Sequence, residues 1–414
     1  MKRNVSVKIW MAVLSMLASS CVRETVLLDE ASELDGEQVC ACAVVEDAVV
    51  LQVGADKPFK TVKEAAAAAG NNTVIEINAG TYKGDVAGWT QDSLVIRASG
   101  GEVVMDADGK SFGGKGIWEI NGGRVCVEGI TFINAKVSDR NGAGIRLTQG
   151  NLTVIDCHFL HNENGILTAN SQTITLRVEN CEFGYSGYGD GQSHNLYAGK
   201  IGSLYVTGSY FHDANIGHLL KSRAAVNQIY YNLIADGDSA TSKASYEIDL
   251  PSGGQAFIVG NIIQKSATPD NTNVIAFAKE ETNFYPNNQL YLCYNTILCN
   301  RKANDKVLTA PPSVTEKYVF NNAISDNLKF DTGIPLTEEK GNIFFQTDEI
   351  LNYYPLASVL ETWKSQHEKG IDSRLPSNLK LESLSLIPHY QYKSPLGITP
   401  IGEPLMPGGV HIPD

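Results

Sequence analysis

Eight segments of this 414-residue chain carry the same short pattern. In each, an apolar residue is followed after a gap by an Asn, Cys, Ser or Ile that stands two places before an aromatic or aliphatic residue. We call this Asn, Cys, Ser or Ile the ladder position of its segment. Two examples are LTVIDCHF (Leu152–Phe159) and LYLCYNTI (Leu290–Ile297). The ladder positions lie 23 to 34 residues apart and are Ile130, Cys157, Cys181, Ser209, Asn232, Asn261, Asn295 and Asn322.

A period of this length indicates an array of structural units. Apolar residues alternate within each unit, which is typical of a short strand. One strand per unit cannot bury its apolar face alone, so the units must stack. We therefore predict an all-β parallel solenoid over residues 47–344. The chain is 43% hydrophobic, which is enough to fill a long core.

The N-terminus predicts export. Lysine and arginine side chains precede an apolar run over residues 9–18 that is too short to span a membrane, and small residues then lead to Cys21. The order is typical of a bacterial lipoprotein, so we predict a signal peptide over residues 1–20, lipidation of Cys21 and a tether over residues 21–46. The expected location is the outer membrane or cell surface of a Gram-negative bacterium. Ordinary signal-peptide cleavage near Cys21 is the alternative.

Charge and cysteine content limit the partners. A formal net charge of −13 argues against general affinity for nucleic acids, although a locally basic groove stays open. We expect a monomer. The cysteines show no paired zinc-binding spacing. Cys157 and Cys181 share the ladder position on adjacent coils, which places their Cα atoms about 4.8 Å apart. We favour two stacked buried thiols over a disulfide at that site.

Both ends of the solenoid have candidate caps. Thr61 can cap a helix that runs through an alanine stretch and ends at Gly70. The segment 53–85 resembles the entry of right-handed parallel β-helix proteins of the pectate lyase and pectin esterase type. The resemblance implies that this helix plugs the open N-terminal end, where an unpaired strand would invite aggregation. Residues 345–414 are predicted to form an irregular C-terminal cap and tail with a helix over residues 356–367.

Polar side chains gather at matching offsets in three consecutive coils. Because neighbouring coils stack at about 4.7–4.9 Å, such residues form columns. The three coils contribute His194, Tyr197 and Lys200, then His218, Lys221 and Arg223, then Glu247 and Asp249, and Arg146 falls in the same band of an earlier coil. Charged outward side chains are usually solvated or paired with a neighbour. This concentration favours a functional groove, with surface ion pairs as the alternative.

The alternation of apolar residues predicts which of these side chains face outward. If the apolar residues of each strand take the core, Lys221 and Arg223 point outward on one coil. Glu247 and Asp249 then point outward together on the next coil. A basic pair would face an acidic pair across one coil spacing.

One of these segments resembles an enzyme family. Residues 219–237 resemble the Lys-Ser segment of β-helix polysaccharide lyases of the chondroitinase B and alginate lyase type, in the pectate lyase superfamily. The fold resemblance covers roughly residues 50–330. It implies that Lys221 abstracts the C5 proton of a uronate and that the substrate is an acidic polysaccharide. A divalent cation such as calcium is the cofactor that the resemblance implies.

The chain departs from that family at two places. NIGH, at residues 215–218, stands where the family has acidic calcium ligands. Glu247 and Asp249 stand where an Arg-His pair is expected. The candidates that remain for the charge neutraliser and the acid are His194, Tyr197 and Arg223.

Neighbouring charges decide whether Lys221 can be a base, because a base must be uncharged. Arg223, roughly 6.6 Å away on the same face, should depress the lysine pKa through a repulsion of about 2.5 kcal/mol at an effective dielectric constant near 20. Glu247 at about 5 Å would oppose this by roughly 3 kcal/mol. An ion pair between Lys221 and Glu247 would make the lysine a poor base.

Two other functions stay open. Glu247 and Asp249 could serve a glycoside hydrolase, because outward residues two places apart put their carboxyl groups about 7 Å apart, as inverting enzymes require. A surface lipoprotein could also bind a glycan without cleaving it. We favour a lyase for a uronate-containing polysaccharide. The predicted catalytic residues are Lys221, Arg223, Glu247 and His194, and the predicted substrate-binding residues are Tyr197, Lys200, His218, Asp249 and Arg146.

Overall fold

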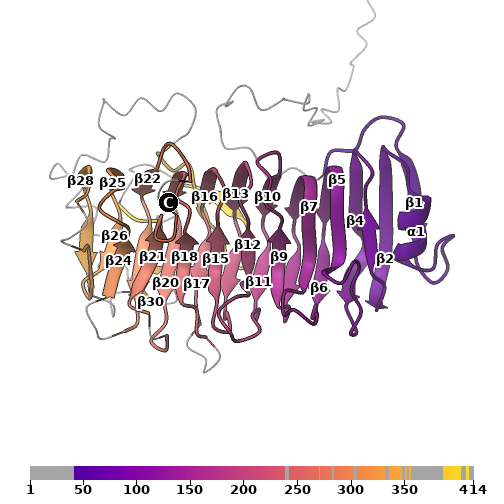
Figure 1. The fold of residues 1–414 in the computed structure, drawn as a ribbon, viewed down its shortest axis with the longest axis horizontal. Coiled ribbons are helices and arrows are strands. Elements are labelled where there is room, and N and C mark those ends of the chain that lie inside the picture. The colour runs from indigo at the N-terminus through magenta and orange to yellow at the C-terminus, as the bar shows by residue number, and fades with distance from the viewer. Residues whose placement is uncertain are drawn as a thin grey trace, which may run out of the picture.

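The chain folds into a right-handed parallel β-helix, which confirms the predicted fold class. In the computed structural model, coils stack along the long axis of the molecule and form three parallel sheets (Figure 1). The structure describes residues 42–237, 242–269, 271–281, 284–301, 305–331, 335–346, 350–351, 354–355, 386–401 and 407–409. Cys21 and the helix expected over residues 356–367 lie outside the described residues.

Each coil contributes strands to the sheets, and long strands near the N-terminus pass from one sheet into the next. Sheet 1 contains β3 (Ala87–Trp89), β5 (Gly116–Glu128), β7 (Ala143–Ile155), β9 (Asn164–Thr168), β12 (Leu196–Ala198), β15 (His218–Ser222), β18 (Tyr246–Leu250), β21 (Asn273–Phe277), β24 (Asp305–Thr309) and β27 (Leu328–Lys329). Sheet 2 contains parts of β5 and β7 together with β1 (Val49–Val53), β2 (Thr73–Lys83), β4 (Leu94–Asp106), β10 (Thr175–Glu179), β13 (Ser203–Thr207), β16 (Val226–Tyr230), β19 (Gln255–Val259), β22 (Gln289–Cys293), β25 (Glu316–Phe320) and β28 (Glu338–Lys340).

Sheet 3 forms the third side of each coil. It contains parts of β2 and β4 together with β6 (Ile130–Ile133), β8 (His158–Leu160), β11 (Glu182–Gly184), β14 (Tyr210–His212), β17 (Leu233–Ala235), β20 (Ile262–Lys265), β23 (Thr296–Cys299), β26 (Ala323–Ser325) and β29 (Ile343–Phe345). Two short antiparallel pairs follow, β30 (Ile350–Leu351) with β31 (Tyr354–Pro355) and β32 (Tyr390–Tyr392) with β33 (Ile398–Pro400).

From Cys181 to Asn322, the ladder positions form a continuous buried hydrogen-bond column between sheets 2 and 3. The backbone N–H of Asn232 donates to Oδ1 of Asn261 at 2.9 Å, and the N–H of Asn261 donates to Oδ1 of Asn295 at 3.0 Å. The same bond recurs from Asn295 to Asn322, and Asn342 extends the column by one coil. These amides satisfy backbone groups that a turn in the core would leave unpaired.

Apolar stacking fills the interior. Phe132, Phe159, Phe183 and Phe211 occupy one register position on successive strands of sheet 3. Their rings stack with centroids 5.2, 4.8 and 4.7 Å apart. Each fully buried ring stabilises the fold by roughly 1.5–3 kcal/mol relative to an exposed one. The column therefore fixes coil against coil.

The predicted N-terminal capping helix is present as α1 (Val62–Ala68) at the β1 end of the solenoid (Figure 1). Thr61 caps it by accepting from the N–H of Glu64 at 3.1 Å. The Asp85 carboxylate accepts from the N–H groups of Val62 and Lys63 at 2.6 and 2.9 Å, so residues outside the helix also satisfy its first turn. Val62 and the alanines on the same face are buried over the end of the core.

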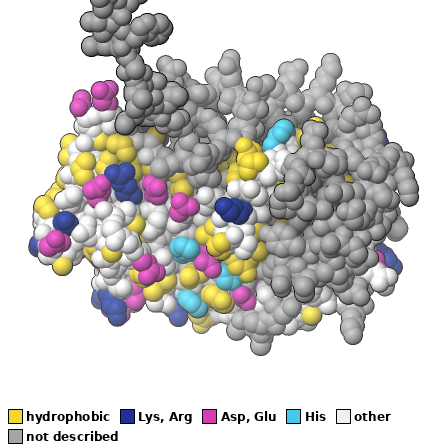
Figure 2. Space-filling model, turned by 180° about the vertical axis from the view of Figure 1, so that it is seen from behind, with side chains coloured by type: hydrophobic (Ala, Val, Ile, Leu, Met, Phe, Trp, Pro, Cys, Tyr) yellow, Lys and Arg dark blue, Asp and Glu magenta, His cyan; other side chains and the backbone are white. Residues whose placement is uncertain are grey.

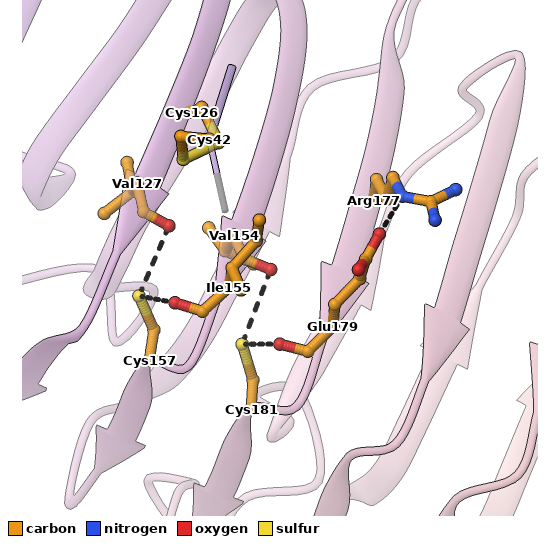
Figure 3. Close-up of a disulfide and its surroundings, with 9 residues drawn as sticks. All are labelled: Cys42, Cys126, Val127, Val154, Ile155, Cys157, Arg177, Glu179 and Cys181. Atoms are coloured by element: carbon orange, nitrogen blue, oxygen red, sulfur yellow. Dashed lines mark hydrogen bonds and ion pairs between the residues drawn. A yellow bond between two sulfur atoms is a disulfide. The ribbon is translucent and has the colours of Figure 1, made fainter. Parts of the chain in front are cut away.

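A disulfide that the sequence analysis did not predict joins Cys42 to Cys126 (Figure 3). The two Cα atoms lie 5.8 Å apart, and the bond closes a separation of 84 residues. Cys126 lies on β5 in sheet 2, so the bond fixes the end of the predicted tether to the solenoid. Disulfides persist in oxidising compartments.

Cys157 and Cys181 are free buried thiols, as predicted (Figure 3). Each sulfur donates to carbonyl groups of its own and the preceding coil. Cys157 donates to Val127 at 3.6 Å and Cys181 donates to Val154 at 3.6 Å. Burial raises the pKa of the Cys181 thiol well above its usual value, so this side chain behaves as a small core residue.

Described parts of the C-terminal region pack along the solenoid. The N–H of Gly397 donates to the carbonyl of Gly208 at 2.8 Å, and that of Gly409 donates to Oγ1 of Thr296 at 3.0 Å. Leu386 is buried against aromatic residues of sheet 2. Within the described ranges, the structure contains no helix with the length and apolarity needed to cross a membrane.

Candidate functional site

Sheet 1 brings most of the predicted site residues onto one outer strip. In its parallel register, Tyr197 on β12 pairs with Lys221 on β15, and Lys221 pairs with Asp249 on β18. Leu220 and Ile248, their neighbours along the strands, are fully buried in the core. The alternation of the strands therefore sends Tyr197, Lys221 and Asp249 outward in one column.

Lys221 is held by two carboxylates. Its Nζ lies 3.1 Å from Oδ2 of Asp249 and 3.7 Å from Oε1 of Glu280. Nε2 of His218 lies 3.2 Å from the same Asp249 oxygen. Burial alone would raise the pKa of Asp249, but the His218 hydrogen bond and the His218 and Lys221 charges outweigh it and lower that pKa. Asp249 is thus an ionised counter-charge for Lys221 and a hydrogen-bond partner of His218.

Arg223 follows β15 and reaches across three coils. Its Nε donates to the Tyr197 hydroxyl at 3.0 Å, and its Nη1 donates to the Ser252 hydroxyl at 3.1 Å. Its Nη2 donates to the Glu280 carboxylate. Burial would lower the arginine pKa, but the hydrogen bonds to Glu280 and Tyr197 raise it above the usual value. The guanidinium is a permanent charge next to the phenol.

Lys200 lies at the edge of this group. Its Nζ lies 3.1 Å from the Glu281 carboxylate and 4.0 Å from the centroid of the Phe284 ring. Glu281 also accepts from the Ser252 hydroxyl at 2.8 Å. That hydrogen bond lowers the pKa of Glu281, with Lys200 contributing.

The sequence analysis missed the two glutamates that pair with these cations. Glu280 and Glu281 follow β21, and both backbone N–H groups donate to the Pro251 carbonyl, at 3.1 and 3.0 Å. This anchoring fixes the acidic loop over the end of sheet 1. The only signal was the adjacent pair of acids one coil beyond the predicted cluster. The side chains of β21, the strand before them, are mostly buried. Spacing along the chain therefore did not show that the loop carrying Glu280 and Glu281 folds back toward Lys221 and Arg223.

His194 lies under the outer strip and not in it. Only 1% of the residue is exposed, and its Nδ1 accepts from the His218 N–H at 3.0 Å. The imidazole stacks on His218 and packs edge-on against Tyr197, with centroids 4.7 and 5.1 Å away. Burial, together with nearby cationic groups, keeps the pKa of His194 well below its usual value. A neutral His194 can position Tyr197 and His218.

The prediction that Glu247 faces outward with Asp249 is wrong. Glu247 is fully buried, and its Oε2 lies 3.3 Å from Nζ of Lys265, which is also fully buried. Burial raises the pKa of Glu247 to about 8. Lys265 belongs to β20 in sheet 3, so the partner that draws this carboxylate inward comes from another side of the coil. Local alternation along β18 does not reveal it.

Arg146 lies on the same outer column, farther toward the N-terminus. It pairs with Glu119 on β5 and with Leu167 on β9, and Leu167 pairs with Tyr197. Three coil spacings therefore separate Arg146 from Lys221. Arg146 therefore lies in the predicted band but does not contact the ion pairs of Lys221 and Arg223.

The described residues do not fit a divalent cation at this site. No three His, Cys, Asp or Glu side chains in the described ranges converge in a way that could hold a metal. The nearby carboxylates already pair with cations: Asp249 pairs with Lys221, and Glu280 pairs with Lys221 and Arg223. Figure 2, which views the molecule from behind relative to Figure 1, shows Lys and Arg side chains interspersed with Asp and Glu side chains on that face.

Several known structures are similar to this chain at low sequence identity. Pectate lyase Pel9A is 14% identical, with a TM-score of 0.49, and the match covers 88% of this chain and 97% of that one. A pectin methylesterase in complex with a hexasaccharide is 12% identical, with a TM-score of 0.36 and coverage of 81% and 100%. The ORF18 protein of Geobacillus virus E2 is 13% identical, with a TM-score of 0.43, and the match covers 66% of this chain and 53% of the ORF18 protein.

Sequence comparison gives the family. No functionally curated protein matches the chain significantly. Residues 52–297, more than half of the chain, match the profile described as "Protein of unknown function (DUF1565)". The matched region runs from β1 to β23 and contains every outward residue of the strip on sheet 1. The chain belongs to the DUF1565 family.

Proposed function

We propose that this protein is a polysaccharide lyase that cleaves a uronate-containing polysaccharide by β-elimination. The observation that carries the proposal is the grouping of an amine, a guanidinium and a phenol on one outer strip. Lys221 stands in register with Tyr197, and Arg223 donates to the Tyr197 hydroxyl at 3.0 Å. Elimination beside a carboxylate needs a base, a cation for the developing charge and an acid for the leaving oxygen.

In the proposed reaction, the neutral amine of Lys221 removes the C5 proton of a uronate. The electron pair of that C–H bond forms the C4–C5 double bond, and the bond from C4 to the glycosidic oxygen breaks. The Tyr197 hydroxyl gives its proton to that oxygen, and Arg223 stabilises charge on the uronate carboxylate. The proton that Lys221 has taken then returns to the Tyr197 phenolate, which restores both groups. The Lys221 nitrogen lies 5.5 Å from the Tyr197 ring centroid.

Glu280 occupies the place proposed for the substrate carboxylate. It pairs with both Lys221 and Arg223. A uronate that replaces Glu280 at Arg223 also removes one of the two carboxylates from Lys221.

Glycan binding without cleavage is the second candidate function. The observation that favours it is the complete pairing of Lys221 with Asp249 and Glu280, an arrangement suited to a fixed cation. The hydrolase alternative has less support, because Glu247 is buried against Lys265 and cannot act together with Asp249 on the outer face.

We also propose that the protein is exported and anchored by lipidation of Cys21. The disulfide between Cys42 and Cys126 supports an oxidising compartment outside the cytoplasm. The outer membrane or cell surface of a Gram-negative bacterium remains the proposed location. Metabolic labelling of the wild type and of Cys21→Ala with a fatty-acid analogue tests the anchor, because only the wild type should incorporate label.

The deciding experiment is a screen of uronate-containing polymers with and without a chelator. A lyase releases products that absorb in the unsaturated-uronate band, and Lys221→Ala should abolish them while Lys221→Arg retains little. New reducing ends without that absorbance would show hydrolysis. Binding without any cleavage would show a binding module. Loss of activity on chelation, restored by calcium, would show a metal requirement.

A further inference from the structure

Arg146 is a cation of sheet 1 whose charge is poorly matched by its surroundings. Its Nε is buried and has no hydrogen-bond partner among the described residues. The cations two and three coils farther along differ, because Lys200 pairs with Glu281 and Arg223 pairs with Glu280. Removing a charged donor from water without a partner is costly, so such a group calls for an explanation.

The strand places this guanidinium on the outside of the solenoid. Ile145 and Leu147, on either side of Arg146 in β7, are fully buried, so the arginine points outward while remaining only partly exposed. Burial lowers the pKa of Arg146, and the charges of Glu119 and Asp139 offset only part of that effect. The surroundings therefore leave room for a further negative charge at this position.

The parallel register links Arg146 to the proposed base. The outward column runs from Arg146 through Leu167 and Tyr197 to Lys221, one coil at each step. Three coil spacings correspond to about 14 Å between the backbone positions. Leu167 contributes no charge between the two cationic positions. An anion at Arg146 is consequently separate from one at Lys221 and Arg223.

We propose that Arg146 is a second carboxylate-binding position for the polysaccharide, about 14 Å from Lys221 along the column. The planar guanidinium matches a carboxylate through two parallel N–H donors. The ligand is then an oligosaccharide whose acidic groups reach both positions, and a disaccharide is too short to do so. This inference rests on the proposed function, because it assigns a second contact to the same substrate.

Equilibrium binding to oligomers of different length tests the assignment. Calorimetry would use digalacturonate and hexagalacturonate, with di- and hexamannuronate as a second pair, in the Tyr197→Phe background to suppress cleavage. Arg146→Gln should weaken binding of the hexamer about 10- to 100-fold, the effect of losing a charged hydrogen bond, and should leave the dimer unchanged. Arg146→Lys should restore part of the loss.

Arg97→Gln is the matched control, because Arg97 lies on the outer face of sheet 2 and pairs with Glu76 at 2.7 Å. It should not change binding of either oligomer. Equal weakening of dimer and hexamer by Arg146→Gln, or no weakening, would overturn the second position while leaving the proposed function intact. If neither uronate series binds the parent protein, both the proposed function and this inference fail. Thermal unfolding of each variant separates lost binding from lost folding.

Discussion

The Nε of Arg223 donates a hydrogen bond to the hydroxyl of Tyr197 at 3.0 Å, from a strand one coil away. The contact gives the phenol a permanent positive charge as its neighbour, while Tyr197 stays partly exposed above the buried His194. Tyr197 is the residue that we propose as the acid for the leaving oxygen.

Tyr197→Phe should lower kcat by about 10²- to 10⁴-fold, the usual contribution of a positioned acid, and should change KM little. The ring keeps its packing on His194 and loses only the hydroxyl. Tyr246→Phe, which removes another phenol of sheet 1, is the control and should retain activity. Wild-type turnover by Tyr197→Phe would exclude Tyr197 as the acid.

Glu280→Gln should strengthen binding of a uronate oligomer several-fold, because it removes the carboxylate that competes for Lys221 and Arg223. Because the Glu280 side chain is 51% exposed, salt screens its charge, so the gain should shrink at high ionic strength. Calorimetry at low and high salt measures it. Glu316→Gln, on sheet 2, controls for the change in net charge. Weaker binding by Glu280→Gln would mean that Glu280 contacts the substrate instead of occupying its place.

Features that recur once per coil, or that depend only on neighbouring residues in the sequence, could be predicted from the sequence. The hydrogen-bonded ladder from Cys181 to Asn322 follows from a period visible along the chain, and the cap at Thr61 follows from local helix chemistry. The outward positions of Lys221 and Asp249 follow from alternation, because the neighbours on both sides of each residue are buried.

Features that depend on contacts between different coils could not be read in this way. Glu247 turns inward because Lys265, on another sheet, supplies a buried counter-charge. Glu280 reaches the site because its loop folds back on Pro251. The bond between Cys42 and Cys126 depends on the path of a segment that lies outside the repeat. The two residues in each of these contacts do not occupy matching positions on successive coils, so the repeat does not indicate which residues meet.

Asn261→Leu should destabilise the fold by roughly 3–5 kcal/mol, because it leaves buried backbone groups unpaired at about 1–3 kcal/mol each. Oδ1 of Asn261 accepts from the Asn232 N–H, and its Nδ2 donates to the Ile229 carbonyl at 2.9 Å. Denaturant unfolding measures the change. Asn261→Ser should cost less, because Ser209 serves the same ladder with a hydroxyl. Equal stability of the leucine variant and the wild type would show that the ladder does not stabilise the fold.

Asp236→Asn should stabilise the protein at neutral pH. Burial raises the pKa of Asp236 to about 6, although hydrogen bonds from Ala244 and Ser266 oppose the shift. An aspartate in the unfolded chain titrates near 3.9. The folded state therefore binds the proton more tightly, and its stability is greatest below about pH 4 and falls as the pH rises to about 6.

The gain in the free energy of unfolding from Asp236→Asn should accordingly be about 2–3 kcal/mol at pH 7 and should vanish below about pH 4. Urea unfolding of the variant and the wild type across this range measures it as a difference, which cancels other titrating groups. Asp56→Asn, at a side chain that is 77% exposed, controls for the loss of one negative charge. A gain that is the same at every pH would show that the asparagine acts through packing and not through the proton.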